Sequence, residues 1–250
     1  MNSPALRRQA PVPPGEACLT LSLPVPGVRA GITARPLDGA DREQAARLVS
    51  RLTGVPGGRV VHLRQIHSRR VWTVGEAGLS SHSEGDALVS RSAGLALSVR
   101  VADCAPVVLA ADDASAIGIV HAGWRGAAAG VAGAAVQALC TLAGCPPEQV
   151  HAALGPSLGR CCFEVGPEVA VRFASELIIR DGSRLLLDLP GTLAIQLEAA
   201  GLAPGRIDRR AAVCTLCNRG APEGLSFYSH RGSSGGPGRN IAFIVKDDAS

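Results

Sequence analysis

The sequence predicts an α+β fold built as a single domain. Short apolar runs bounded by turn residues dominate the chain, and only a few segments show the three-and-four spacing of an amphipathic helix. Strands and helices do not alternate regularly, which argues against a βαβ architecture. A chain of 250 residues can bury a sizeable core, and no linker rich in Pro, Ser and Gly interrupts residues 28–230. We therefore expect a proline-rich disordered tail over residues 1–16 and one domain over residues 17–250.

The first half of the chain reads mainly as strands. Aliphatic and β-branched residues form short runs separated by Gly, Pro, Asp and Ser, as expected for strands joined by turns. One helix, beginning with Asp41–Arg47, is predicted between the second and third strands. The predicted strands are Leu19–Val25, Val28–Thr33, Arg59–Leu63, Arg70–Val74, Asp86–Val89, Leu95–Val101, Val107–Ala111 and Ile117–His121.

A longer helix is predicted between Gly126 and Gly144. Its apolar residues recur at the spacing of one buried face, and a glycine is a typical C-terminal stop. Their small size predicts close packing on a sheet. The residues of this face are Val131, Ala134, Ala135, Ala138, Leu139 and Leu142.

The remainder of the chain mixes both kinds of element. Val150–Leu154 reads as a strand, and an apolar run, Leu185–Leu189, precedes the second of two further helices. The two helices are predicted over Pro167–Leu177 and Pro190–Gly201. The last strands are predicted over Ile207–Val213, Ser226–Ser229 and Asn240–Val245.

Composition excludes several classes of protein. Hydrophobic residues make up 46% of the chain and charged residues 18%, which is typical of a globular protein. The net charge of +4 is modest and the arginines are scattered, so we expect no nucleic-acid partner. No apolar run approaches the roughly 18 residues of a membrane helix, and the N-terminus lacks the apolar segment of a secretory signal. Eight cysteines in such a chain indicate a reduced, cytoplasmic protein rather than a disulfide framework.

The most informative stretch is Val101–Gly126. Two apolar runs joined by a polar turn predict a hairpin, whose outer ends carry Cys104 and His121. A hairpin brings its outer ends together, so these two side chains should face each other. His67 lies upstream, at the end of another apolar run. One thiolate and two imidazoles are the protein ligands of a catalytic zinc site that keeps its fourth position open.

Other polar residues near these ligands are candidates for the chemistry. Asp103 should point away from the metal if the chain there is extended, which suits a residue that orients a ligand or transfers a proton. Gln65 and His67 alternate with an apolar residue and are predicted to share one strand face along a cleft. Arg125 follows His121 at the start of a helix, where it could help to hold an anion.

Four further cysteines form two groups, Cys161-Cys162 and Cys214-x-x-Cys217. Adjacent cysteines chelate poorly compared with a CxxC pair, and the spacing is not that of a zinc ribbon. We therefore predict that these thiols are reduced, pack near the cleft and bind no second metal.

Several motifs run in a fixed order over residues 28–245. They are GITAR (Gly31–Arg35), QIHS (Gln65–Ser68), EGDALVS (Glu84–Ser90), VADCAPVVL (Val101–Leu109), HAGWRG (His121–Gly126), LGPSLGRCCFEVGPEV (Leu154–Val169), CTLC (Cys214–Cys217) and FYSHRG followed by GRNIAFI (Phe227–Ile244). In these motifs the chain resembles the laccase-domain family, once described as multicopper polyphenol oxidoreductases and associated with purine nucleoside phosphorylase activity.

The resemblance implies a fold and a reaction. The fold would be two mixed β-sheets packed face to face with helices on the outside, in α/β/β/α layers. His67, Cys104 and His121 would bind Zn²⁺, and Asp103, Cys104 and His121 would be the catalytic residues. The reaction would be cleavage of adenosine-, inosine- or guanosine-type nucleosides by inorganic phosphate. Adenosine deaminase and methylthioadenosine phosphorylase activities would accompany it.

The same resemblance implies a substrate site. Arg35 matches the family's Thr-Arg position and would hold phosphate, together with Arg125, while Gln65 would contact substrate. The chain departs from the family directly afterwards, because the Gly-rich stretch is cut to Pro36–Ala40 and no Asn-Arg pair opens the next helix. The partner would be a small nucleoside, and both a monomer and a homodimer remain open.

Three other functions stay open on the sequence alone. Cys104 and His121 could be the nucleophile and base of a cysteine hydrolase or amidase. A copper polyphenol oxidase is less well supported, because laccase chemistry needs many histidines and the chain has six. The domain could also be an inactive binding module.

Overall fold

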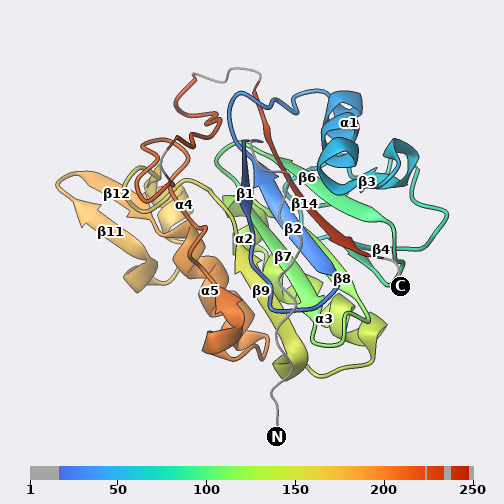
Figure 1. Ribbon diagram of the computed structural model, residues 1–250. Helices are drawn as coiled ribbons and strands as arrows, with labels where there is room; N and C mark the ends of the chain where they lie inside the picture. The colour runs from blue at the N-terminus through green and yellow to red at the C-terminus, as the bar shows by residue number, and fades with distance from the viewer. Residues whose placement is uncertain (1–16, 81, 223, 234–237, 248–250) are drawn as a thin grey trace, which may run out of the picture.

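The domain is a stack of four layers, with two β-sheets in the middle and helices on both outer sides (Figure 1). This confirms the α+β class and the layer order expected from the sequence. The structure is a computed structural model that describes residues 17–80, 82–222, 224–233 and 238–247. The tail expected over residues 1–16 lies outside these described residues.

The first sheet has five strands in the order β1-β2-β14-β6-β3. Their bounds are Cys18–Thr20 (β1), Val28–Thr33 (β2), Asn240–Lys246 (β14), Ala96–Val101 (β6) and Val60–His62 (β3). β3 runs parallel to β6 and the other pairs are antiparallel, so the sheet is mixed.

The second sheet has six strands in the order β13-β9-β7-β8-β5-β4. Their bounds are Ile207–Asp208 (β13), Val150–Leu154 (β9), Ala105–Ala111 (β7), Ile117–Ala122 (β8), Ala87–Ser90 (β5) and Val71–Val74 (β4). The central strands are antiparallel, whereas each edge strand runs parallel to its neighbour.

Alternation along the strands of the six-stranded sheet builds a separate core on each of its two faces. In β7, Val108 and Ala110 point towards the five-stranded sheet, and Val107 and Leu109 point to the opposite face. Because both faces are covered, β7 is buried at every residue. This explains why the sequence there is a continuous apolar run rather than an alternating one.

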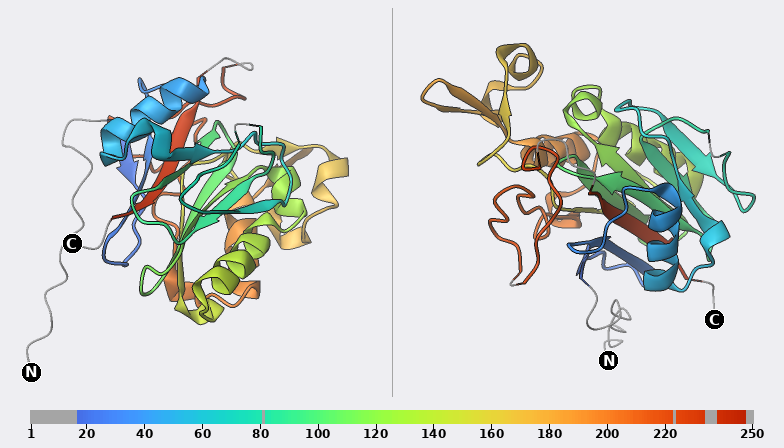
Figure 2. Two further views of the ribbon diagram at one scale, coloured as in Figure 1. Left: turned by 90° about the vertical axis from the view of Figure 1, so that its right-hand side faces the viewer. Right: turned by 90° about the horizontal axis from the view of Figure 1, so that it is seen from above.

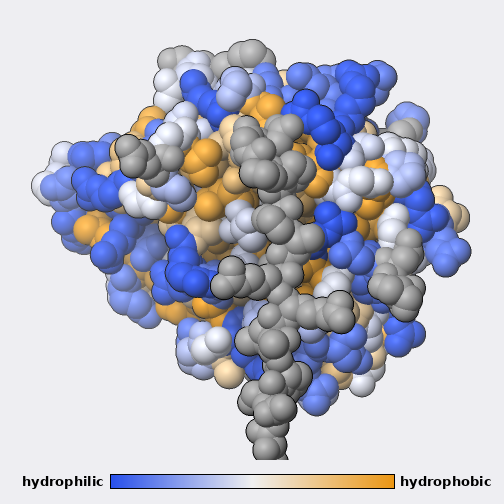
Figure 3. Space-filling view, viewed as in Figure 1, coloured by the Kyte–Doolittle hydropathy of each residue, from blue (hydrophilic) through white to orange (hydrophobic). Residues whose placement is uncertain are grey.

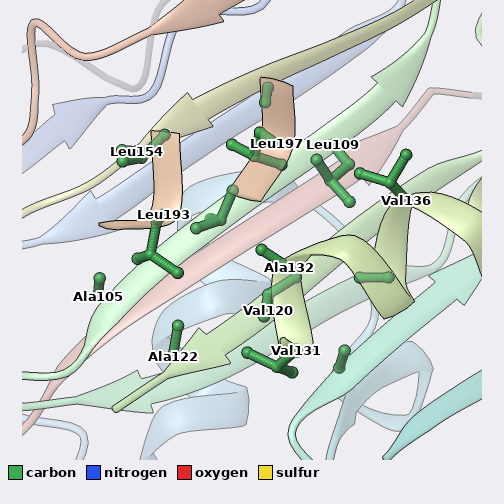
Figure 4. Packing of buried hydrophobic residues seen from close by; sticks show 14 of the residues in the cluster. Ala105, Leu109, Val120, Ala122, Val131, Ala132, Val136, Leu154, Leu193 and Leu197 are labelled. Atoms are coloured by element: carbon green, nitrogen blue, oxygen red, sulfur yellow. The ribbon is translucent and has the colours of Figure 1, made fainter. Parts of the chain in front are cut away.

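The outer layers are helical. α1 (Arg42–Thr53) covers the five-stranded sheet; it begins at Asp41, whose carboxylate accepts hydrogen bonds from the next turn, and ends at Gly54 with φ 77°. α3 (Val131–Ala143) and α5 (Leu189–Ala199) cover the six-stranded sheet (Figure 4). The short α2 (Trp124–Ala128) precedes α3. Three-residue 3-10 turns lie at Gly57–Arg59, Pro147–Gln149, Ser175–Leu177 and Pro204–Arg206.

A third, small sheet replaces part of a predicted helix. It consists of β10 (Glu164–Val165), β12 (Arg184–Leu187) and β11 (Ile178–Asp181), and it projects beside the main sheets in Figure 2. Hydrophilic residues dominate this edge of the molecule in Figure 3. The helix predicted over Pro167–Leu177 is wrong beyond α4 (Pro167–Ala170), because the chain turns into the β11–β12 hairpin.

Three predicted strands also need correction. Residues 226–229 form no strand, β13 ends at Asp208 instead of continuing to Val213, and β1 ends at Thr20 instead of continuing to Val25. The backbone N–H groups of Phe227 and Tyr228 bond instead to the side chains of Asn218 and Asn240. No helix among the described residues is long and apolar enough to cross a lipid bilayer.

Candidate metal centre and its cavity

The β7–β8 hairpin brings Cys104 and His121 together as the sequence predicts. Ala105 pairs with Ala122 and Pro106 with His121, so Cys104, directly before β7, lies beside the end of β8. His67 completes a group in which the ligand atoms of the three residues all lie within 4.8 Å of one another. The Cys104 Sγ is 3.8 Å from the His67 Nε2. The two imidazole rings meet edge to face, with centroids 4.9 Å apart.

This donor set fits zinc. Tetrahedral bonds of about 2.3 Å to sulfur and 2.0 Å to nitrogen place those two ligand atoms about 3.5 Å apart, close to the spacing found here. Three ligands from the protein leave one position free for substrate or water. The spacing of the three side chains is therefore compatible with a shared metal ion that keeps one position open.

Asp86 organises two of the three ligands. Its carboxylate is fully buried and accepts a hydrogen bond of 2.8 Å from the His121 Nδ1–H. That bond leaves the His121 Nε2 facing the Cys104 sulfur. Asp86 was not among the residues selected from the sequence. Its position directly before a buried strand, in EGDALVS, is the signal that could have identified it.

The same carboxylate holds the backbone at His67. It accepts hydrogen bonds from the His67 N–H (3.0 Å), the Ser68 N–H (2.5 Å) and the Ser68 hydroxyl (2.7 Å). His67 has φ 59°, a left-handed conformation that non-glycine residues adopt rarely and that requires such support. The prediction that His67 lies on a strand face is therefore wrong, because a turn presents its ring to the site.

The three charged groups stabilise one another. Burial alone would raise the pKa of the Cys104 thiol, but the His121 and His67 imidazoles lower it to about 6. Burial would lower the pKa of His121, whereas Cys104 and Asp86 raise it to about 9. Burial would also raise the pKa of Asp86, yet hydrogen bonds from His121 and Ser68 lower it to about 2. These interactions favour the thiolate, which is the form of cysteine that binds metals.

Gly123 provides the space for this cluster. A Cβ at this position would lie 2.8 Å from the His67 Cδ2 and 2.9 Å from the Cys104 Sγ. Both neighbours are ligand side chains, so neither can move away without disturbing the site. The glycine is needed for close packing, since its φ of −77° is accessible to any residue.

Asp103 is held firmly beside the site. It has φ 83°, and its carboxylate accepts hydrogen bonds from the Thr215 hydroxyl (2.7 Å) and the Arg231 N–H (2.7 Å). The residue is almost fully buried and lines the cavity described next. Its left-handed backbone turns the chain between β6 and β7. The segment is therefore not extended at Asp103, in contrast to the assumption made from the sequence.

A cavity of about 530 Å³ opens over the metal ligands. This volume lies in the range of small-molecule sites. Besides His67, Cys104, His121 and Asp103, its lining combines apolar and cationic side chains. They include Trp124, Leu158, Phe163 and Leu189 together with Arg64, Arg100, Arg125, Arg231 and Arg239.

Arg100 is the best-placed cation for an anion in this cavity. Its Nη1 donates to the Ala40 carbonyl, but its Nε is buried and has no partner among the described residues. Burial, together with the nearby Arg42 and Arg239, lowers the pKa of its guanidinium. An anion would supply the missing acceptor and would add negative charge to that of the nearby Asp41. Sequence reasoning missed this residue, because no motif sets it apart from other strand arginines.

The predicted substrate residues are only partly brought to the cavity. Gln65 lines it, but the Gln65 amide pairs with the backbone of Arg100, donating to O (2.8 Å) and accepting from N–H (2.9 Å). Arg125 lines the cavity with its guanidinium 4.3 Å from the centre of the Trp124 ring. Arg35 is exposed and is not among the lining residues; it bonds to the Phe227 carbonyl and stacks on Tyr228.

Comparison with known proteins identifies relatives over most of the chain. A mouse protein named purine nucleoside phosphorylase LACC1 is 32% identical over 206 residues, which cover 81% of this chain and 47% of the mouse protein. The chain thus spans about half the length of that relative. A prokaryotic protein named adenosine deaminase RL5 is 33% identical over 226 residues, covering 84% of each chain. Several bacterial relatives also carry the name purine nucleoside phosphorylase.

A solved structure and a family profile agree with these relatives. The crystal structure of YlmD from Geobacillus stearothermophilus superposes with a TM-score of 0.80 at 29% identity, covering 91% of this chain and 94% of that one. The profile of the family described as multi-copper polyphenol oxidoreductase laccase matches residues 38–247. The chain therefore belongs to this laccase-like polyphenol oxidoreductase family.

Proposed function

We propose that the protein is a zinc-dependent purine nucleoside phosphorylase. The observation that carries this proposal is the convergence of His67, Cys104 and His121 in a cavity that Arg100 also lines. The buried Nε of Arg100 has no partner in the part of the chain that the structure describes. A metal ligand set and an anion-binding cation in one cavity suit a reaction between an uncharged nucleoside and phosphate. The names of the relatives support the same reaction.

The protein groups around the metal would have distinct roles. Zinc, when bound, supplies a Lewis acid that polarises an oxygen of substrate or phosphate. Cys104, His67 and His121 would hold it, and the hydrogen bond from His121 to Asp86 would keep the imidazole in the orientation and tautomer that this requires. Apolar residues such as Leu158 and Phe163 exclude water from this part of the cavity, which strengthens the electrostatic interactions there.

Phosphate would bind to Arg100 rather than to Arg35. Gln65 fixes the backbone at Arg100 through two hydrogen bonds and so positions its guanidinium, while Arg239 adds positive charge to the same wall. Arg125 also lines the cavity and adds a further guanidinium. Such an anion site would not need the residues that the shortened stretch after Arg35 lacks.

Asp103 would exchange a proton with the departing purine. Its carboxylate faces the cavity and is oriented by Thr215 and Arg231, so a purine nitrogen can be placed within hydrogen-bond distance. The same pair of a metal and a carboxylate suits attack of water on the 6-amino carbon of adenosine. We therefore include adenosine deamination, with methylthioadenosine as a further substrate for phosphorolysis.

One observation favours a second candidate, a cysteine hydrolase. Asp86, His121 and Cys104 form an acid–base–nucleophile sequence, in which the buried carboxylate orients the imidazole next to a thiolate. In that case the metal would block the nucleophile rather than assist it. Chelation would then raise activity on amides or esters.

The experiment that tests these proposals combines metal analysis with a substrate panel. Protein purified without added metal is analysed for zinc, then incubated with adenosine, inosine, guanosine and methylthioadenosine, with and without phosphate. Release of free base and pentose 1-phosphate only with phosphate, and its loss after chelation, supports the phosphorylase. Amide or ester hydrolysis that survives chelation supports the cysteine hydrolase. Absence of turnover on every substrate contradicts both.

A pair of arginine variants tests the anion site. Arg100→Ala is expected to lower phosphorolysis by at least about tenfold, equivalent to about 1.4 kcal/mol, because a charge-assisted contact to phosphate is lost. Zinc content should stay the same, since Arg100 does not contact the ligands. Arg35→Ala is the matched control and should leave the rate unchanged. The opposite ranking of the two variants would place phosphate at Arg35.

A further inference from the structure

A second group of four cysteines gathers outside the site described above. Cys161 and Cys162 lie in a turn after β9, and Cys214 and Cys217 lie in a loop after β13. Their four sulfurs all lie within 4.8 Å of one another, and the Cys161 and Cys217 sulfurs are 3.5 Å apart. All four are free thiols. The spacing of these cysteines along the sequence argued against a shared metal. In the folded chain, however, two distant segments bring two sulfurs each to the same place.

The arrangement of the sulfurs matches a tetrathiolate metal site. Four thiolates at about 2.3 Å from a zinc ion, at the corners of a tetrahedron, lie about 3.8 Å from one another. Cysteines that pack only as small apolar residues need not direct all their sulfurs to one point. Convergence of four sulfurs from two loops is therefore better explained by a shared ligand.

Backbone contacts fix the two loops against each other. The Ser157 N–H donates to the Val213 carbonyl (3.0 Å), and the Thr215 N–H donates to the Ser157 carbonyl (2.9 Å). Gly159 allows the close approach, since a Cβ there would lie 3.3 Å from the Cys214 Cβ and 3.4 Å from the Cys161 Sγ. The ligands are thus held in place before any metal binds.

Turn residues and cationic side chains surround the four cysteines. Asn218, directly after Cys217, has a left-handed φ of 50°, so the backbone turns sharply at this ligand. Arg160, Arg209 and Arg219 line a cavity beside Cys161 and Cys214, together with one acidic residue, Asp188. The excess of positive charge there would offset part of the net charge of −2 that four thiolates and one divalent ion carry.

We propose that Cys161, Cys162, Cys214 and Cys217 bind a second, structural zinc ion. Four protein ligands leave no open position, so this site would not bind substrate. It would instead order the loop that supports the cavity: Thr215, between two of the ligands, donates the 2.7 Å hydrogen bond to Asp103. The Leu158 N–H, just before the other two ligands, donates to the Asp103 carbonyl. The second metal would thus fix Asp103 from both sides.

Metal content tests the proposal independently of enzyme activity. Protein expressed with ample zinc and purified under reducing, anaerobic conditions is expected to hold two zinc ions per chain. Cys217→Ser and Cys104→Ser should each retain about one, and the double variant close to none. Cys140→Ser, on α3 and outside both groups, is the matched control and should retain two.

If Cys217→Ser fails to fold, the proposal can still be tested by replacing zinc with cobalt in the unaltered protein and recording its absorption spectrum. Cobalt in the four-cysteine site should give the strong sulfur-to-metal charge transfer and visible bands of tetrathiolate coordination. These are distinct from the weaker bands of a site with one sulfur and two nitrogens, and they should persist in Cys104→Ser. One zinc ion per chain with no tetrathiolate spectrum would overturn the proposal. A Cys161–Cys217 disulfide in the anaerobic protein would overturn it as well.

Discussion

Cys104→Ser is expected to lose the zinc ion at the His67–Cys104–His121 site and to lower phosphorolysis by about a thousandfold or more. A serine hydroxyl stays protonated at neutral pH and binds zinc far more weakly than a thiolate does. Polarisation of the substrate by a metal typically stabilises the transition state by several kcal/mol. A thousandfold decrease in rate corresponds to about 4 kcal/mol. Zinc analysis and initial rates on inosine with phosphate measure both effects.

Cys140→Ser serves as the control for a general effect of removing a thiol, because Cys140 lies on α3, away from the cavity lining. The two candidate functions differ in what Cys104→Ser retains. Full zinc content together with complete loss of activity would exclude Cys104 as a ligand and favour its role as a nucleophile. Unchanged zinc and unchanged activity would exclude both roles.

Asp86→Asn is expected to have the second-largest effect, although Asp86 touches no metal. The neutral amide oxygen accepts hydrogen bonds from the His121 Nδ1–H and from the backbone N–H groups of His67 and Ser68 more weakly than a carboxylate does. The NH₂ group of the asparagine would also face these donors and could accept from none of them. Loss of such an orienting carboxylate typically weakens metal affinity by about 10–100-fold. Leaving buried donors unsatisfied also costs about 1–3 kcal/mol of folding stability. Zinc titration and denaturant unfolding measure the two losses.

The stability that Asp86→Asn loses should be largest at neutral pH and should shrink as the solution becomes strongly acidic. Burial would raise the pKa of Asp86, but hydrogen bonds from His121 and Ser68 lower it from 3.8 to about 2 in the folded protein. The ionised carboxylate therefore contributes its full stabilisation above pH 3.8, and this contribution is lost as the pH falls towards 2. Ser68→Ala, which removes only the 2.7 Å hydroxyl contact, is the milder control. Equal zinc affinity in Asp86→Asn and the unaltered protein would contradict the orienting role.

The hairpin and its two ligands could be predicted because they depend on local sequence. Two apolar runs and a polar turn define β7 and β8, and their pairing follows from turn geometry alone. Most strand positions were recovered for the same reason. The layer order came from resemblance to the family, since periodicity does not reveal which sheet a strand joins.

Residues that act through tertiary contacts could not be predicted. Asp86 is separated from His121 by 35 positions in the sequence. The two residues meet only because β5, which follows Asp86, pairs with β8, which contains His121. The left-handed turn at His67 exists because Asp86 supports it, so local propensity gave a strand instead. What distinguishes Arg100 among the described arginines is a buried Nε without a partner in the described chain, and this is a property of packing.

The second half of the chain shows the same limit. Residues 167–177 have helical periodicity, but the small β10–β12–β11 sheet outweighs it after Ala170. The cysteines were judged by spacing along the chain, whereas their sulfurs meet because the bridge between Ser157 and Cys214 aligns two distant loops. Contacts between residues far apart in the sequence thus determine both the structure after Ala170 and the position of the four cysteines.

Gly123 has a consequence for recognising inactive relatives. Its missing side chain is what allows the His67 ring and the Cys104 sulfur to approach each other. A homologue with alanine at this position would keep every ligand and still hold them too far apart for a metal. Surveys that score only ligand residues would count such a sequence as an enzyme. The glycine before the tryptophan in HAGWRG is therefore as diagnostic of a working centre as the histidine that opens the motif.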